Sequence, residues 1–335
     1  MRIFNKIILI ILGMVFSISC NRSGNTNIQT NKTSIATPPE FLTIRKPNLY
    51  PEGIEYDAKH TRFLVSSLRE GIIGSACDCG SFTTFIKNEK LVSTIGIRID
   101  TKRNRLLVCN SDPGVSINTN PKTQNKLAGL GIFDLSDGKL IKYYDLGNLK
   151  PGAHFCNDIA LDNEGNAYIT DSFSPIIYKV DNNDNASIFL TDKQFEGKGF
   201  NLNGIVAGNG FIIVAKSNEG LLFKIPLNDP AKFTQIKIDR NFPGADGLLW
   251  SQDGTLILIA NLVNVPINKV FKLSTNDNWS SAKVVSEFDT GFVFPTTGTK
   301  RSDSIYVIYS MLHKLFDPNN KEATNTFTIK KVKLN

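Results

Sequence analysis

Six short segments share one pattern, in which a run of β-branched, aliphatic or aromatic residues ends in small or polar ones. They are RFLVSS (62–67), RLLVCN (105–110), NAYITD (166–171), FIIVAK (211–216), TLILIA (255–260) and SIYVIY (304–309). Turn-forming residues stand just before several of them, as in DNEGN (162–166) and SQDGT (251–255). Turn residues between two apolar runs favour tight hairpins, so each repeat is predicted to begin with a strand, a turn and a second strand.

Further strands follow within the repeats. A third segment alternates apolar and polar residues and runs into another turn, as in GIFDLSDG (131–138), IIYKVDNND (176–184), LLFKIPLND (221–229) and KVFKLSTND (269–277). A fourth is visible in SIFLTD (187–192) and KVVSEFD (283–289). Four strands in a unit that recurs every 43–61 residues indicate β-propeller blades. The longest spacing contains a polar insertion at 112–130, which is interpreted as a loop.

The repeats predict an all-β fold, a six-bladed β-propeller with four-stranded antiparallel blades. The last repeat ends at its third strand, TFTIKKVKLN (326–335), and FLTIRK (41–46) precedes the first. We therefore expect the N-terminal strand to supply the missing fourth strand and close the ring. A multi-sheet sandwich is the alternative, but it does not predict so regular a repeat.

The N-terminus predicts export. MRIFNK is basic, and the apolar run from Ile7 to Ser19 is too short to span a bilayer, so residues 1–19 are interpreted as a signal peptide. The segment ending at Cys20 resembles the lipobox of bacterial lipoproteins, which implies lipidation of Cys20; an ordinary signal peptide is the alternative. Residues 20–40 are polar and predicted to be a flexible tether, and 41–335 the propeller. We expect an exported protein on the cell envelope, at the outer membrane in a Gram-negative cell, with membrane contact through the lipid anchor only.

Composition narrows the function classes. The 335 residues are 41% hydrophobic and 21% charged, which is enough to form a large core. The net charge of +7 is scattered without a dense basic stripe, so nucleic acid is not an expected partner. There are three histidines, His60, His154 and His313, too few to favour a multi-histidine zinc site. A monomer that acts on a small molecule is expected.

The residues that enter the innermost strands are the candidate site. In a propeller these strands line a central channel. At matching distances before the repeated runs stand two acids and two amides, with Gly96 and Thr296 at the same position in blades two and six. The four are Glu52, Asn157, Asn203 and Asp246. Converging carboxylates repel, so the pKa of at least one of these two acids would rise unless a cation were bound. Oxygen ligands suit Ca²⁺ or Mg²⁺. The lack of His or Cys among the four argues against zinc and copper.

The sequences around these residues resemble one family. PEGIEYD (51–57), CNDIALDNEGNAYITD (156–171), NGIVAGNGFIIVA (203–215) and ADGLLWSQDGTLILIA (245–260) are similar to motifs of the SMP-30/gluconolactonase family of six-bladed propellers. The resemblance covers roughly residues 47–316. It implies that Glu52, Asn157, Asn203 and Asp246 hold one divalent metal, Ca²⁺ or alternatively Mg²⁺, Mn²⁺ or Zn²⁺. It also implies hydrolysis of a small lactone or ester, in which the metal polarises the carbonyl and activates water and Asp246 is general base or nucleophile.

One departure from the family changes the expected substrate. Sugar lactonases of this family carry an arginine two residues before the first asparagine, where this chain has Phe155. The change favours a more apolar lactone, ester or phosphoester. The neighbouring His154 is either an auxiliary base or a loop histidine bonded to the backbone. Phe294, Tyr306 and Tyr309 either line the channel or fill the space between blades.

Two other functions remain open. The absent arginine and the insertion at 112–130 favour a non-catalytic surface propeller that binds a ligand or protein, with a structural metal or none. A lyase would need a histidine in the channel, and the scarcity of histidines argues against it. Cys77, Cys79, Cys109 and Cys156 are expected to form a structural disulfide or to remain buried thiols.

Overall fold

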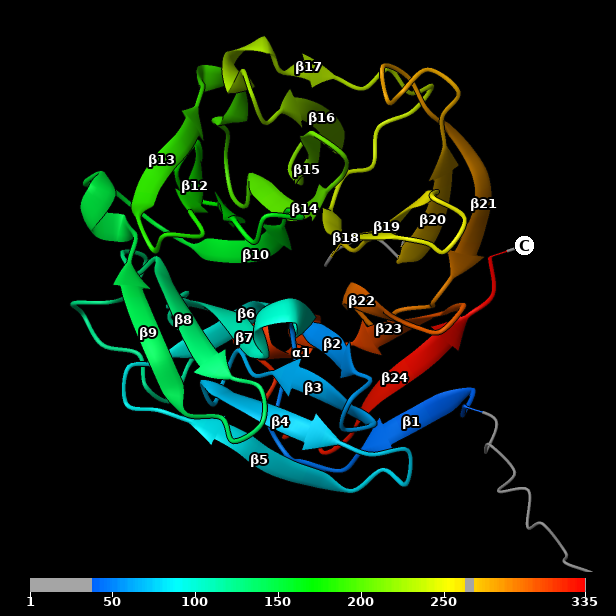
Figure 1. Cartoon of the computed structure of the whole chain (residues 1–335). Coiled ribbons are helices and arrows are strands. Elements are labelled where there is room, and N and C mark those ends of the chain that lie inside the picture. The colour runs from blue at the N-terminus through cyan, green and yellow to red at the C-terminus, as the bar shows by residue number, and fades with distance from the viewer. Residues whose placement is uncertain (1–37, 263–267, 335) are drawn as a thin grey trace, which may run out of the picture. The chain divides into compact units, whose positions relative to one another are not determined.

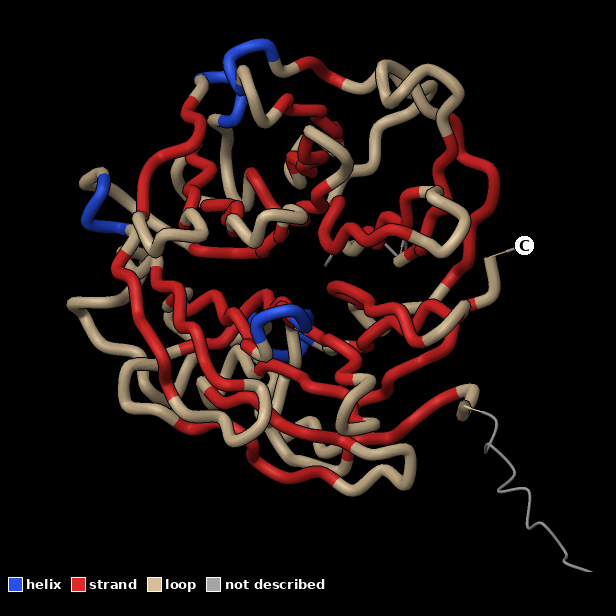
Figure 2. The backbone as a smooth tube through the Cα atoms, viewed as in Figure 1, coloured by secondary structure: helices blue, strands red, loops and turns tan. Residues whose placement is uncertain are grey.

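The fold is a ring of six four-stranded antiparallel sheets around a central axis (Figure 1). The computed structural model describes residues 38–262 and 268–334, which belong to one compact unit, Pro38–Asn335. Strands dominate, and the connections carry only short helices (Figure 2). The six-bladed all-β propeller predicted from the repeats is confirmed. The predicted signal peptide (1–19), Cys20 and the tether as far as residue 37 lie outside the described residues.

The first three blades are built from consecutive strands. Blade one contains β2 (Ile54–Asp57), β3 (Arg62–Ser66), β4 (Ile72–Ala76) and β5 (Phe82–Lys87). Blade two contains β6 (Ser93–Asp100), β7 (Arg105–Ser111), β8 (Gly129–Asp134) and β9 (Leu140–Asp145). Blade three contains β10 (Cys156–Leu161), β11 (Ala167–Asp171), β12 (Ile176–Val180) and β13 (Ala186–Thr191).

The next two blades follow the same plan, and the sixth combines both ends of the chain. Blade four contains β14 (Leu202–Ala207), β15 (Phe211–Lys216), β16 (Leu221–Pro226) and β17 (Thr234–Gln235). Blade five contains β18 (Ala245–Trp250), β19 (Leu256–Ala260), β20 (Lys269–Ser274) and β21 (Lys283–Asp289). Blade six contains β22 (Pro295–Arg301), β23 (Ser304–Tyr309), β24 (Phe327–Val332) and β1 (Phe41–Ile44).

The helices are short and lie between strands. They are the 3₁₀ turns η1 (Thr101–Arg103), η2 (Gly147–Leu149), η3 (Lys193–Phe195) and η4 (Pro230–Lys232), and the α-helix α1 (Leu312–Phe316). No helix in the described part of the chain has the length and apolar character needed to cross a bilayer.

The N-terminal strand closes the ring, as predicted. β1 pairs antiparallel with β24, with Leu42 opposite Ile329 and Ile44 opposite Phe327 (Figure 1). Leu42 and Ile44 are buried, whereas Phe41 is 60% exposed. Because β1 and β24 come from opposite ends of the sequence, their pairing joins the first and last parts of the propeller in one sheet.

Stacking of the blades explains the repeated apolar runs. In β3, Phe63, Leu64 and Val65 are all fully buried, because both faces of the strand pack against neighbouring parts of the fold. A strand buried on both faces reads as a continuous apolar run. The outermost strand β21 instead alternates between exposed and half-buried residues, as expected for one solvated face.

A β-bulge near the start of the inner strands sets which residue faces the axis. In blade two the pairing with β7 shifts between Thr94 and Ile97, so Ile95 stands where Asn157 stands in blade three. The prediction that Gly96 occupies this position is therefore wrong by one residue. Gly96 is the second bulge residue, and a Cβ there would lie 2.4 Å from the Asn157 carbonyl oxygen. Only glycine allows the two inner strands to approach so closely.

Candidate active site

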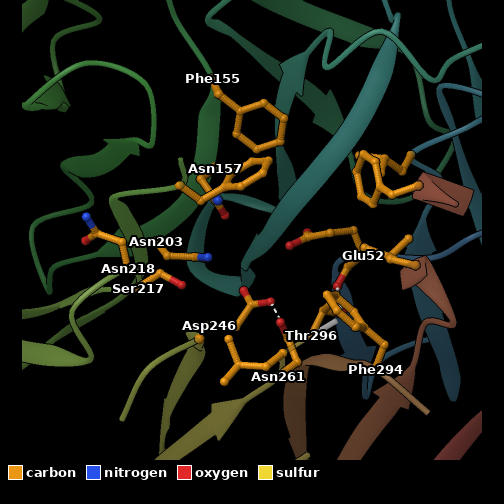
Figure 3. Close-up of a pocket in the computed structure, with 16 residues that line it drawn as sticks. Glu52, Phe155, Asn157, Asn203, Ser217, Asn218, Asp246, Asn261, Phe294 and Thr296 are labelled. Atoms are coloured by element: carbon orange, nitrogen blue, oxygen red, sulfur yellow. Dashed lines mark hydrogen bonds between the residues drawn. The ribbon is translucent and has the colours of Figure 1, made fainter. Parts of the chain in front are cut away.

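A cavity of about 350 Å³ opens at one end of the propeller axis. The four candidate residues line it together with Thr296, and Figure 3 shows Glu52, Asn157, Asn203 and Asp246 pointing toward one another across it. The surrounding wall is largely apolar and is formed by Leu68, Phe155, Phe200, Leu262, Phe294, Leu312 and Phe316. The structure thus brings together all four residues that the sequence selected, beneath a collar of apolar side chains.

The bulges explain why these side chains converge. Asn157, Asn203 and Asp246 each occupy the first bulge position of their inner strand, in β10, β14 and β18. Glu52 lies two residues before β2, and the amide of the intervening Gly53 donates a 2.6 Å hydrogen bond to the Ser66 hydroxyl of β3. A position repeated in successive blades of a ring faces the same axis, so four segments separated in sequence contribute to one site.

Three oxygen atoms at the site have no hydrogen-bond partner among the described residues. They are Oε2 of Glu52, Oδ1 of Asn157 and Oδ1 of Asn203, and all three are buried. Asn157 is oriented by Nδ2, which donates to Ser172 Oγ at 2.8 Å, so its oxygen is the atom left free. Buried polar atoms are normally paired, because an unpaired one loses its hydration without compensation. The cluster therefore lacks a positively charged or hydrogen-donating partner.

The electrostatics of the site lead to the same conclusion. Burial raises the pKa of Asp246 to about 8; the Asn261 hydrogen bond opposes the shift, and the Asp158 charge adds to it. Burial, with the charges of Asp246 and Asp158, raises the pKa of Glu52 well above its usual range. Without a cation the two carboxyl groups cannot both ionise readily near neutral pH.

Polar residues after the second strands hold the site residues in place. Asn261, which follows β19, donates from Nδ2 to Asp246 Oδ2 at 2.6 Å and to the Pro295 carbonyl at 2.7 Å. Ser172, which follows β11, donates from Oγ to the Leu202 carbonyl at 2.5 Å. Ser310, after β23, shares a 2.7 Å hydrogen bond with Thr296. Polar residues that directly follow three of the repeated runs thus support the axial residues.

The donor set fits a hard divalent cation. It consists of two carboxylates and two amide side chains, with the three unpaired oxygens among them. Oxygen ligands of this kind suit Ca²⁺ and Mg²⁺. Across residues 38–262 and 268–334, no three His, Cys, Asp or Glu side chains gather in a metal-binding group. A site here must therefore include the asparagine oxygens, which argues against the nitrogen and sulfur ligands typical of zinc.

His154 is a buried structural residue. Its Nδ1 lies 2.7 Å from Asp171 Oδ2 and its Nε2 lies 2.7 Å from the Lys150 carbonyl oxygen. Burial lowers the pKa of His154, but the Asp171 hydrogen bond and charge outweigh it, and the net shift is upward. Both ring nitrogens are engaged and the side chain does not line the cavity. Of the two interpretations of this residue, the loop histidine holds and the auxiliary base does not.

The apolar wall contains residues that the sequence did not reveal. Phe155 packs against Phe173 and Phe200 with ring centroids 5.3 and 5.1 Å apart. Phe200 lies in the loop before β14, and Phe316 is the last residue of α1. Neither segment is part of the repeated sequence pattern. Phe294 does line the cavity, whereas Tyr306 is buried against Phe63. No periodic signal marks the loop residues, so only the folded ring identifies them.

None of the four cysteines of the propeller is among the described residues that line the cavity, although Cys156 stands between Phe155 and Asn157 in the chain. Cys77 and Cys79 form a disulfide, and Cys109 and Cys156 are free and buried. Burial and the neighbouring Cys156 raise the pKa of Cys109 well above its usual range, so it remains a thiol at neutral pH. Both expected outcomes, a disulfide and a pair of buried thiols, therefore occur in this chain.

The sequence matches no family model and no curated protein. The structure is similar to the allergen Mala s 1 of Malassezia sympodialis, with a TM-score of 0.70, 17% identity and coverage of 88% of this chain and 96% of that one. The likeness is one of fold. A putative gluconolactonase is similar with a TM-score of 0.56 and 13% identity, over 88% of this chain and 93% of that one. Virginiamycin B lyase from Staphylococcus aureus is similar with a TM-score of 0.56 and 12% identity, over 88% of this chain and 98% of that one.

Proposed function

We propose that this protein is a divalent-metal-dependent hydrolase of a small lactone or ester. The observation that carries the proposal is the set of unpaired buried oxygens of Glu52, Asn157 and Asn203 beside Asp246. In the proposal these four side chains hold one cation, with Ca²⁺ favoured over Mg²⁺, Mn²⁺ or Zn²⁺. When bound, such an ion polarises a carbonyl and makes a nearby water more acidic.

The protein's own groups would then bind the substrate and move one proton. Asn261 holds Asp246 through Oδ2, which leaves Oδ1 to accept the proton of the attacking water. When the bond between the carbonyl carbon and the leaving oxygen then breaks, Asp246 would return this proton to the leaving oxygen. Phe155 and Phe294 flank the floor of the cavity and would exclude bulk water from the reacting groups (Figure 3). Arg is absent from the described cavity wall, so the wall is better suited to an apolar substrate than to a sugar lactone.

The runner-up is a propeller that binds a ligand without turnover. It would keep the same cavity and could keep the same cation, so geometry does not separate it from a hydrolase. A lyase is less favoured, because no histidine lines the described part of the cavity to serve as its acid or base.

Removal and return of the cation tests the proposed site. After treatment with EDTA, addition of Ca²⁺ at ~100 times its Kd is expected to stabilise the fold by roughly 2.7 kcal/mol. The Asp246→Asn variant has nearly the same shape but lacks the charge, and it should show little response. Thermal melts followed by circular dichroism measure both. If neither Ca²⁺, Mg²⁺, Mn²⁺ nor Zn²⁺ moves the midpoint, the metal site is not present.

A turnover assay separates the two functions that share this site. The Ca²⁺-loaded protein should hydrolyse members of a panel of alkyl lactones and aryl esters, and Asp246→Asn should lower the rate by roughly 10²–10⁴-fold. A protein that binds Ca²⁺ but hydrolyses none of the panel would favour the binding propeller.

Ser172→Ala should weaken the cation site without removing a ligand. The change deletes the hydroxyl that fixes the Asn157 amide, and loss of such a support typically lowers metal affinity about 10- to 100-fold. Isothermal titration with Ca²⁺ measures the effect. Ser174→Ala is the matched control, since among the described residues Ser174 Oγ bonds only the Ala153 carbonyl. Equal affinities in the two variants would show that the Ser172 hydroxyl does not hold the Asn157 amide in the position that the cation requires.

A further inference from the structure

Exposed apolar side chains gather on the loops that surround the cavity mouth. The described residues include eight large apolar side chains with high exposure, and three of them, Phe41, Ile141 and Val285, stand on outermost strands of different blades. The other five lie in loops that either enter an innermost strand or follow a second strand. They are Ile117, Leu149, Phe200, Phe292 and Phe316. In antiparallel blades both kinds of loop emerge at the same end of the ring.

Contacts between the loops confirm that they form one rim. Phe200 and Phe316 both line the cavity. The Phe292 ring packs on His313 of α1 with centroids 4.4 Å apart. The Ile117 amide donates to the Arg69 carbonyl at 2.9 Å, next to the cavity residue Leu68. The insertion also meets the loop of Leu149, since the His154 amide donates to the Asn125 carbonyl.

Lysines accompany the apolar residues of this rim. Lys150 follows Leu149, Lys198 precedes Phe200 by two residues, and Lys314 precedes Phe316 by two. All three lysines are exposed, and none has an ion-pair partner in the described part of the chain.

Two of the three exposed apolar residues outside the rim, Ile141 and Phe41, stand next to charges that are paired. Lys142, beside Ile141, lies 3.3 Å from the Asp184 carboxylate. Phe41 follows Glu40, which pairs with Lys331 and Lys333. The cavity mouth therefore gathers five exposed apolar side chains and three lysines that have no ion-pair partner among the described residues. Glu196 and Asp317 are exposed on the same loops, so the positive charge of the mouth is partly offset.

We propose that the cavity mouth docks on an anionic lipid bilayer. Apolar side chains interspersed with lysines are typical of surfaces that insert at the boundary between headgroups and acyl chains, with each lysine attracted to anionic lipid. This contact is made by the propeller itself and adds to the anchor expected at Cys20. It directs the cavity toward the membrane, from which an apolar ligand can enter. The docking does not depend on catalysis or on a bound metal.

Vesicle sedimentation of the compact unit Pro38–Asn335, which lacks Cys20, tests the proposal. We expect the protein to bind vesicles of phosphatidylcholine with about a third phosphatidylglycerol, to bind pure phosphatidylcholine more weakly, and to be released by added salt. The double variant Ile117→Ser/Phe292→Ser should lower partitioning at least about tenfold. Lys150→Gln/Lys198→Gln/Lys314→Gln should lower it roughly 10- to 100-fold on the anionic vesicles only.

A matched control separates docking of the cavity mouth from nonspecific adsorption of exposed apolar residues to vesicles. Ile141→Ser/Val285→Ser removes apolar side chains that are 58% and 43% exposed, close to the 65% and 48% of Ile117 and Phe292. This control should bind vesicles like the wild type, and unchanged melting curves would show that each variant is folded. No binding to either vesicle, or an equal loss in the control, would overturn the proposal. Self-association without vesicles that is lost in Ile117→Ser/Phe292→Ser would instead make a second copy the occupant of the rim.

Discussion

Replacement of Ile44 by aspartate will prevent the ring from closing. Ile44 is fully buried in β1 and lies opposite Phe327 in the only sheet that joins the two ends of the described chain. A carboxylate there loses its hydration without gaining a partner, and the apolar contacts of Ile44 are lost as well. We expect the free energy of unfolding to fall by more than about 4 kcal/mol, a large part of the 5–15 kcal/mol typical of folded proteins.

Phe41→Asp is the control for this effect. Phe41 belongs to the same strand but is 60% exposed, so a charge at this position stays hydrated. Urea unfolding followed by circular dichroism should give nearly the wild-type midpoint for Phe41→Asp and a much lower one for Ile44→Asp. A wild-type midpoint for Ile44→Asp would mean that the N-terminal strand does not hold the propeller together.

Without a divalent cation, the protein will lose stability as the pH rises from about 4 to about 8. The folded protein holds the Asp246 proton until about pH 8, whereas unfolded aspartate releases it near 3.8. Between these values the unfolded chain binds fewer protons than the folded one, so the free energy of unfolding decreases with pH. The slope reaches about 1.4 kcal/mol per pH unit for each such carboxyl group. Glu52, whose pKa is also raised, shifts stability in the same direction.

Asp246→Asn isolates the contribution of this carboxyl group. The variant cannot ionise at position 246, so in EDTA its stability should depend less on pH and exceed that of the wild type at pH 8. Chemical denaturation at pH 5 and pH 8 measures the difference. If the wild type and the variant respond to pH alike, burial of the Asp246 carboxyl does not control the stability of the metal-free protein.

The axial residues show how much of the site can be predicted from the sequence. Glu52, Asn157, Asn203 and Asp246 could be selected because each stands at nearly the same distance before a repeated apolar run. Blade two shows the limit of this approach. The bulge between Thr94 and Ile97 places Ile95, not Gly96, at the axial position, and a one-residue shift of this kind has no marker in the apolar pattern.

The residues that support the axial side chains and those that form the cavity wall were harder to predict from the sequence. Asn261 directly follows a repeated run, yet only the fold shows that it reaches Asp246 at 2.6 Å. The sequence also did not show that His154 contacts the Asp171 carboxylate and the Lys150 carbonyl, because these contacts depend on how the loop before β10 folds. Phe200 and Phe316 come from loops of irregular length, so no spacing predicts that they meet at one cavity.

The sequence by itself determined the strands, the six blades, the closure by an N-terminal strand and the four residues around the axis. These features follow from local periodicity, because an inner strand, its turn and its neighbour recur in each blade with similar geometry. The tertiary structure alone decided the register in blade two, the role of His154, the raised pKa values of Glu52 and Asp246, and the apolar rim. Each of these depends on contacts and burial among segments far apart in the chain, which come together only when the ring is closed.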